Sequence, residues 1–200
     1  MDQGIIWGEN VGIRPLFPTD APMIRRFMTD PEVVHLLFEE EGGDPPSSWA
    51  LAGMIGMNWL NARPDWGIVE RGGRLIGSVR LWRVSVRNRN AMLTIFIGDK
   101  NRWGKGYGTE ALRLALHQAF GLMQLLRVEL HVFEFNTRAI RSYEKVGFVR
   151  EGARRGALVR NGRLHDILVM GILRDEFYAR EAKVGKQPER IQESQGRIQL

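Results

Sequence analysis

The chain has 200 residues, a formal net charge of +6 and no cysteine, which suits one domain in a reducing compartment and excludes disulfides and thiolate metal sites. Its histidines stand far apart and its arginines lack interleaved aromatic residues, so we expect no metal and no nucleic-acid partner, although a small polyanion would suit the charge. The first ten residues do not resemble a signal peptide and no apolar run reaches membrane-spanning length, so we expect a cytoplasmic protein with no membrane partner.

The first half of the chain predicts two helices and an antiparallel meander. A strand over residues 9–16 is followed by a helix with Thr19 or Asp20 as its N-cap. A loop over residues 39–48 leads to a second helix, from Trp49 to Asn61. Three closely spaced strands follow, and this spacing indicates antiparallel pairing: residues 66–70, 74–86 and 91–98.

The second half predicts helices and strands that end in a hairpin. Apolar residues at helical spacing from Leu112 to Met123 indicate a helix. A strand follows in which Val128, Leu130 and Val132 alternate inward with Glu129, His131 and Phe133 outward.

A short helix should begin at Asn136 as N-cap and end at Gly147, and a long hairpin should turn at Asn161 and Gly162. From Ala179 onward the chain is polar. We therefore expect one domain over residues 1–178 and a polar tail, frayed or mobile, over residues 179–200.

The segment NRWGKGYGTEA, residues 101–111, places three glycines at every second position just before a predicted helix. Unpaired N–H groups and the helix dipole favour an anion there. Glycine also lets a phosphate approach the backbone closely, and Arg102 and Lys105 add positive charge. A tight turn that serves packing alone is the alternative, but the combination predicts a pyrophosphate site.

Two other phosphate-binding motifs fit less well. The Walker A motif needs Lys followed by Ser or Thr after its last glycine, whereas Lys105 lies between the glycines. Gly106, Gly108 and Ala111 do satisfy the dinucleotide pattern GxGxxA, and Glu134 stands where a ribose-binding acid belongs. That pattern normally opens a parallel sheet, however, and here it follows an antiparallel meander, so the context excludes it.

Two linked segments resemble the hallmarks of the GNAT superfamily of acetyl-CoA-dependent N-acetyltransferases. Gly106 and Gly108 match its pyrophosphate signature, Q/R-x-x-G-x-G/A, and NTRAIRSYEKVGF, residues 136–148, is similar to its second motif. Trp103 replaces the Q/R residue, as in the subgroup resembling ribosomal-protein N-terminal acetyltransferases. The resemblance covers residues 9–173. It implies an α+β GNAT fold, whose mostly antiparallel twisted sheet has about six to seven strands with a splayed central pair, flanked by about four helices.

The same resemblance implies where acetyl-CoA binds. The backbone of Phe96 and Ile97 would hydrogen-bond the pantetheine arm, and Asn136 would reach the arm from the opposite side. Arg102 is a weaker candidate for a phosphate contact because it lies one place before the signature position. The other residues expected at the pyrophosphate lie in the glycine loop: Gly104, Lys105, Gly106, Tyr107, Gly108 and Thr109.

The implied mechanism is direct attack of an amine on the thioester in a ternary complex, and the lack of cysteine excludes a Cys-based route. Tyr143 matches the family's general acid, which protonates the CoA thiolate, and an ordinary tyrosine pKa of about 10 nearly balances that of a thiol. A packing role for Tyr143 is the alternative. Glu134 is our candidate for the general base, with Glu129, His131, Asp99 or a water chain as alternatives.

The expected acceptor is a primary amine, either a peptide N-terminus or a small amine such as a polyamine or an aminoglycoside. Glu39, Glu40 and Glu41 lie in a loop that borders the acceptor site in this family, and they would attract a cationic amine unless the loop is merely exposed. A CoA-binding regulatory or scaffold module without turnover is the alternative function. We also expect a homodimer.

Overall fold

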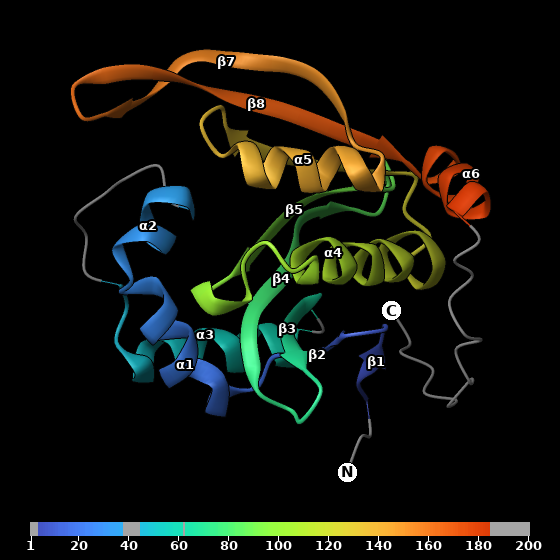
Figure 1. Cartoon of the computed structure of the whole chain (residues 1–200). Helices are drawn as coiled ribbons and strands as arrows, with labels where there is room; N and C mark the ends of the chain where they lie inside the picture. The colour runs from blue at the N-terminus through green and yellow to red at the C-terminus, as the bar shows by residue number, and fades with distance from the viewer. Residues whose placement is uncertain (1–3, 38–44, 62, 185–200) are drawn as a thin grey trace.

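The computed structural model describes residues 4–37, 45–61 and 63–184, and in these residues one eight-stranded sheet runs through the molecule (Figure 1). Its strand order is β1-β2-β3-β4-β5-β6-β8-β7, and every neighbouring pair is antiparallel except β5 and β6. The strand bounds are β1 Ile6–Trp7, β2 Val11–Pro15, β3 Asp65–Glu70, β4 Leu75–Ser85, β5 Asn90–Ile97, β6 Arg127–Phe133, β7 Val149–Arg160 and β8 Arg163–Leu173.

Helices cover both faces of the sheet. Because side chains alternate along a strand, the neighbours Ile68 and Val69 on β3 pack into different cores, one under α4 and α5 and the other under α1 and α3. The helix bounds are α1 Ala21–Met28, α2 Pro31–Leu37, α3 Ser48–Leu60, α4 Tyr107–His117, α5 Thr137–Val146 and α6 Arg174–Val184. Helices α4 and α5 lie side by side in Figure 1.

Strands β5 and β6 run parallel but pair only where both begin. Their register spans three pairs, from Asn90 with Arg127 to Met92 with Glu129. Beyond these pairs β5 stays on β4 up to Ile97, and β6 stays on β8 up to Phe133. The expected splayed central pair is therefore confirmed, and a gap opens between the carboxyl ends of the two strands.

The described residues contain more elements than the sequence predicted. Strand β1 has only two residues, and helix α2 has seven, of which Val33 is buried. Neither is long enough to show a clear hydrophobic period. Helix α6 crosses the expected start of the tail and packs through Phe177, which lies against Phe120 and His117. The structure thus has eight strands and six α-helices in its described part, instead of six to seven and four.

Strand β6 keeps the predicted alternation, because Val128, Leu130 and Val132 pack into one core and Phe133 into another, but its second face is not left to solvent. Phe133 is buried instead of facing solvent, and it packs with Leu158 and Ile167. These two residues belong to the β7–β8 hairpin, which extends along α5 in Figure 1. The hairpin covers the end of β6, so both faces of the strand are buried there.

No helix among the described ranges is long and apolar enough to cross a membrane.

Gly77 provides a test of how tightly β4 packs on β5. It pairs with Ile97, and a Cβ atom at Gly77 would collide with the backbone carbonyl of Phe96. We expect Gly77→Ala to lower the free energy of unfolding by about 2 kcal/mol or more, measured by urea denaturation, because backbone cannot move aside as a side chain can.

Gly53 is the matched control. It lies in α3, and a Cβ atom there would meet nothing within 4 Å. Gly53→Ala should raise the free energy of unfolding by about 0.5 to 1 kcal/mol, because alanine loses less backbone entropy in a helix. Equal effects at both positions would contradict the packing described for Gly77.

Candidate active site

A cavity of about 510 Å³ occupies the gap between β5 and β6 and continues along α5. It brings together residues that the sequence placed at the cofactor and the general acid. Lys105 is exposed and does not line this cavity. The predicted residues that line it are Phe96, Ile97, Arg102, Gly104, Gly106, Tyr107, Gly108, Thr109, Asn136 and Tyr143.

The glycine loop, residues 104–109, supplies backbone N–H donors at the cavity. Gly104 and Gly106 have φ angles of 75° and 85°, a left-handed conformation that favours glycine. Gly106 is the N-cap of α4, and the first bond of the helix joins the amide of Glu110 to the carbonyl of Gly106 at 3.0 Å. The N–H groups that precede Glu110 in the first turn have no partner within the helix, so they can bind an anion.

Ion pairs fix the segment that leads into this loop. Arg102 donates two hydrogen bonds to Glu70, at 2.7 and 3.0 Å, and this contact lowers the pKa of Glu70. Lys100 lies 2.9 Å from Asp30 and 2.6 Å from Glu32. Arg102 thus lines the cavity, but its guanidinium is already engaged by a carboxylate.

Trp103 connects the glycine loop to β5 and α5. Its indole N–H donates to the carbonyl of Ile97 at 2.6 Å, and the guanidinium of Arg138 lies 3.8 Å from the centre of its ring. The carbonyl of Ile97, expected to face the pantetheine arm, therefore already accepts one hydrogen bond. The aromatic residue at the Q/R position of the signature has a structural role in this chain.

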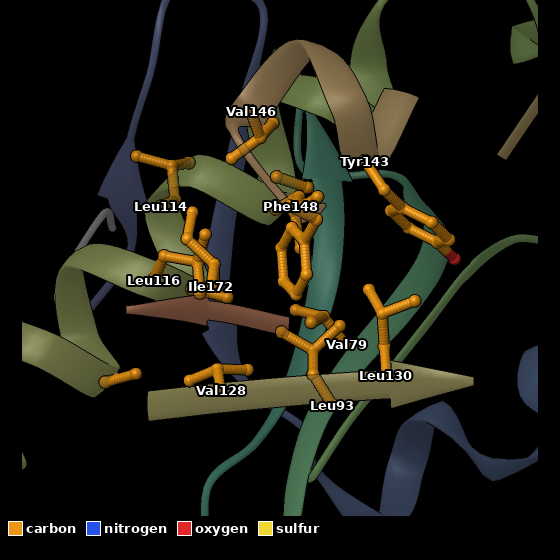
Figure 2. Close-up of a cluster of buried hydrophobic side chains, with 14 of the residues drawn as sticks. Val79, Leu93, Leu114, Leu116, Val128, Leu130, Tyr143, Val146, Phe148 and Ile172 are labelled. Atoms are coloured by element: carbon orange, nitrogen blue, oxygen red, sulfur yellow. The ribbon is translucent and has the colours of Figure 1, made fainter. Parts of the chain in front are cut away.

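Tyr143 stands at the boundary between the core and the cavity. Its side chain packs beside Phe148, and Figure 2 shows its hydroxyl directed away from the other labelled side chains. Burial disfavours the charged phenolate and raises the pKa of Tyr143 to about 12. The Tyr143 hydroxyl therefore stays protonated at neutral pH. Its raised pKa lies further above the pKa of a thiol than an ordinary tyrosine pKa does, so proton transfer from Tyr143 to a thiolate is less favourable.

Asn136 caps α5, as the sequence predicted. Its Oδ1 accepts a hydrogen bond from the amide of Ala139 at 3.2 Å, and the residue lines the cavity. Because the cap uses the side-chain oxygen, the side-chain NH₂ group is the part that can reach a ligand. Gly147 ends the helix with a φ angle of 119°.

Of the four residues that are candidates for the general base, one lines the cavity. Glu134 does not line the cavity, and its Oε1 lies 2.8 Å from Nδ1 of His165. Asp99 is buried and lies 3.0 Å from Arg74. His131 does line the cavity, and its Nε2 is 3.3 Å from Oε1 of Glu129. Glu129 itself is outside the lining.

Other parts of the site were absent from the sequence analysis. Arg138, Arg141 and Lys145 of α5 line the same cavity, and their spacing of three and four residues is a helical signal that could have identified them. Leu36 and Leu37 reach it from α2. Glu39, Glu40 and Glu41, the expected acceptor-binding residues, lie outside the described residues.

Comparison with known proteins agrees with this geometry. Residues 10–149 match the model of the acetyltransferase (GNAT) domain family. Bacillus subtilis YjcK, provisionally named an N-acetyltransferase, is 42% identical over 103 residues, which span 50% of this chain and 55% of YjcK. YdaF of the same organism, provisionally named a ribosomal N-acetyltransferase, is 29% identical and aligns over 84% of this chain and 94% of its own.

A solved structure is also similar. It is the spermidine N-acetyltransferase from Vibrio cholerae in complex with CoA and spermine. Its TM-score is 0.75 at 27% sequence identity, and the match covers 84% of this chain and 98% of the other.

The raised pKa of Tyr143 predicts a pH-dependent stability. The pKa is about 12 in the folded chain and about 10 in an unfolded one. The contribution of Tyr143 is therefore fully present below pH 10 and is lost as the pH rises to 12, by up to about 3 kcal/mol. Urea denaturation between pH 9 and pH 11.5 should show a steeper loss for the wild type than for Tyr143→Phe. Parallel curves would contradict the burial of this phenol.

Proposed function

The chain belongs to the GNAT acetyltransferase family, and we propose that it transfers the acetyl group of acetyl-CoA to a primary amine. One observation carries the proposal: the amide donors of the glycine loop and the hydroxyl of Tyr143 share one cavity between two splayed strands. The loop would hold the pyrophosphate, and the open backbone of β5 would hold the pantetheine arm. Cytoplasmic location and a homodimer stay predictions from the sequence.

The proposed reaction is a direct attack in a ternary complex. The amine nitrogen forms a bond to the thioester carbon, the C–S bond breaks, and the electron pair leaves with sulfur. Tyr143 then donates its hydroxyl proton, or a strong hydrogen bond, to the thiolate. The chain has no cysteine that could form an acyl-enzyme intermediate.

The amine must also lose a proton. Glu134 remains our candidate from the sequence, but the geometry favours His131 because His131 lines the cavity and Glu134 does not. Neutral imidazole can accept the proton directly, and Glu129 at 3.3 Å would stabilise the imidazolium.

The relatives support a primary amine as the acceptor, either on a ribosomal protein or in a polyamine. One is provisionally named a ribosomal N-acetyltransferase, and a similar structure holds spermine. The described lining of the cavity contains no Asp or Glu. A polyamine would therefore have to find carboxylates elsewhere, and Glu39, Glu40 and Glu41 are the predicted source.

An acceptor screen tests the proposed activity. The wild type and Tyr143→Phe would be incubated with acetyl-CoA and separate panels of peptides, polyamines and aminoglycosides, with thiol release and product mass as readouts. We expect an acetylated product with the wild type, and a kcat lowered by about 10²-fold in the variant at an unchanged KM for acetyl-CoA. Thermal stabilisation by CoA without product from any panel would instead indicate a binding module.

Gly108 tests where the pyrophosphate lies. A Cβ atom at Gly108 would be 3.6 Å from Ile97 Cγ1, an ordinary contact, so Gly108→Ala should fold normally. Both residues line the cavity. The methyl group should weaken CoA binding about tenfold in calorimetry, because it obstructs close approach of the phosphate to the backbone.

Gly152→Ala is the control. It lies on β7, away from the cavity, and a Cβ atom there would meet nothing within 4 Å. It should leave the CoA affinity unchanged. The same unchanged affinity for Gly108→Ala would place the pyrophosphate elsewhere.

A further inference from the structure

The cavity reaches both faces of the sheet. Leu93 and Leu130 pack in one core with Tyr143, and Figure 2 shows them on the same side of the strands as Tyr143. Because side chains alternate along a strand, the alternate residues of β5 and β6 point to the other face. Those that line the cavity are Met92, Thr94, Phe96, His131 and Phe133. The cavity therefore has a second chamber on the face opposite Tyr143.

This second chamber has an apolar wall. Trp82 lies opposite Met92 in the pairing of β4 with β5, and both line the cavity. The indole N–H of Trp82 donates to Oγ1 of Thr94 at 3.1 Å, which holds the ring in place. Helix α2 adds three apolar side chains at helical spacing: Val33, Leu36 and Leu37. We call Trp82, Met92 and these three residues the apolar wall.

The second chamber offers no carboxylate to a cationic group. Among the lining residues that the structure describes there is no Asp or Glu. Glu32 of α2 is paired with Lys100 at 2.6 Å, and Glu129, which contacts His131, is paired with Arg127 at 2.9 Å. A buried ammonium group without a counter-charge is costly. An acceptor with a second ammonium group is therefore poorly served by this chamber.

The candidate acid and base stand on opposite faces of the sheet. Tyr143 lies on the α5 side, and His131 lines the cavity on the side of the apolar wall. An amine that loses its proton to His131 would approach the gap from that side. The rest of the acceptor would then lie against the apolar wall.

We propose that the acceptor carries its primary amine next to a large apolar group, and that the apolar wall selects this group. The inference rests on the proposed function, since it assumes that the amine attacks acetyl-CoA in this cavity. Burial of an apolar group against the wall is favourable, whereas the second ammonium group of a polyamine would stay unpaired there. Two kinds of molecule share this chemistry: a free arylalkylamine and a peptide whose first residue is large and apolar.

Steady-state kinetics with matched acceptors tests the inference. Phenethylamine would be compared with ethanolamine, whose amino group has a similar basicity, and a peptide that begins with phenylalanine with the same peptide beginning with serine. At saturating acetyl-CoA, we expect kcat/KM for the apolar member to be about tenfold higher or more in at least one pair. The pair with the larger kcat/KM identifies the source of the amine. Spermidine should react more slowly than the preferred apolar acceptor.

A charge placed in the wall should change this preference. Leu37→Glu should lower kcat/KM for the preferred apolar acceptor about tenfold and raise it for spermidine, because the new carboxylate can pair with an ammonium group. Leu126→Glu is the matched control, since Leu126 is 39% exposed and does not line the cavity. It should keep the wild-type preference.

Met92→Gln is a second test, which also serves if Leu37→Glu does not fold. Glutamine has a similar length and no charge, so kcat/KM for the apolar acceptor should fall about fivefold while that for spermidine does not rise. Calorimetry with CoA checks that each variant is folded, and the affinity for CoA should be unchanged in all three.

The outcomes separate this inference from the proposed function. If each apolar acceptor reacts no faster than its polar partner, or if spermidine is the best acceptor, the selection by the apolar wall is overturned while the acetyltransferase activity stands. The same holds if Leu37→Glu and Leu126→Glu have equal effects on the preference. If CoA binds but no amine is acetylated, the proposed function fails and this inference fails with it.

Discussion

The separation of β5 from β6 is the constraint on which the site depends. Each strand keeps its outer neighbour, β4 or β8, so neither loses its place in the sheet when the two diverge after three pairs. Backbone N–H and C=O groups that face the gap then have no strand partner, and such groups require a hydrogen-bonding partner when water is excluded. A ligand arm that itself contains amide groups would satisfy them under the proposed function. The cavity occupies this gap, and residues of the glycine loop and of α5 line it.

Electrostatics then selects the kind of ligand. Contacts from distant parts of the chain hold the loop: Arg102 with Glu70, and Lys100 with Asp30 and Glu32. Residues of the glycine loop and the basic residues Arg138, Arg141 and Lys145 of α5 all line a cavity whose described lining lacks carboxylates. The cavity therefore favours a polyanionic donor. A cationic acceptor gains no ion pair from this lining, so recognition of the acceptor must depend on other contacts.

The sequence predicted the features that depend on neighbouring residues, but it did not predict the contacts between residues far apart in the chain. The caps at Asn136 and Gly147, the meander and the glycine loop could be predicted because each depends on neighbouring residues. The partner of Arg102 could not, since Glu70 lies 32 residues earlier in the chain. His131 was one of the candidate bases and is exposed as predicted, but its place at the cavity follows from the separation of β5 and β6 beyond Glu129, which the sequence does not show residue by residue. Burial of Phe133 likewise depends on a hairpin formed later in the sequence.

The central claim is that one ligand joins the glycine loop to the gap between β5 and β6. A crystal structure of the protein with CoA tests it most directly. We expect pyrophosphate oxygens within hydrogen-bonding distance of amides between Gly104 and Thr109, the pantetheine arm along β5, and the thiol close to the Tyr143 hydroxyl. CoA bound outside this gap, or with its thiol directed away from Tyr143, would contradict the account.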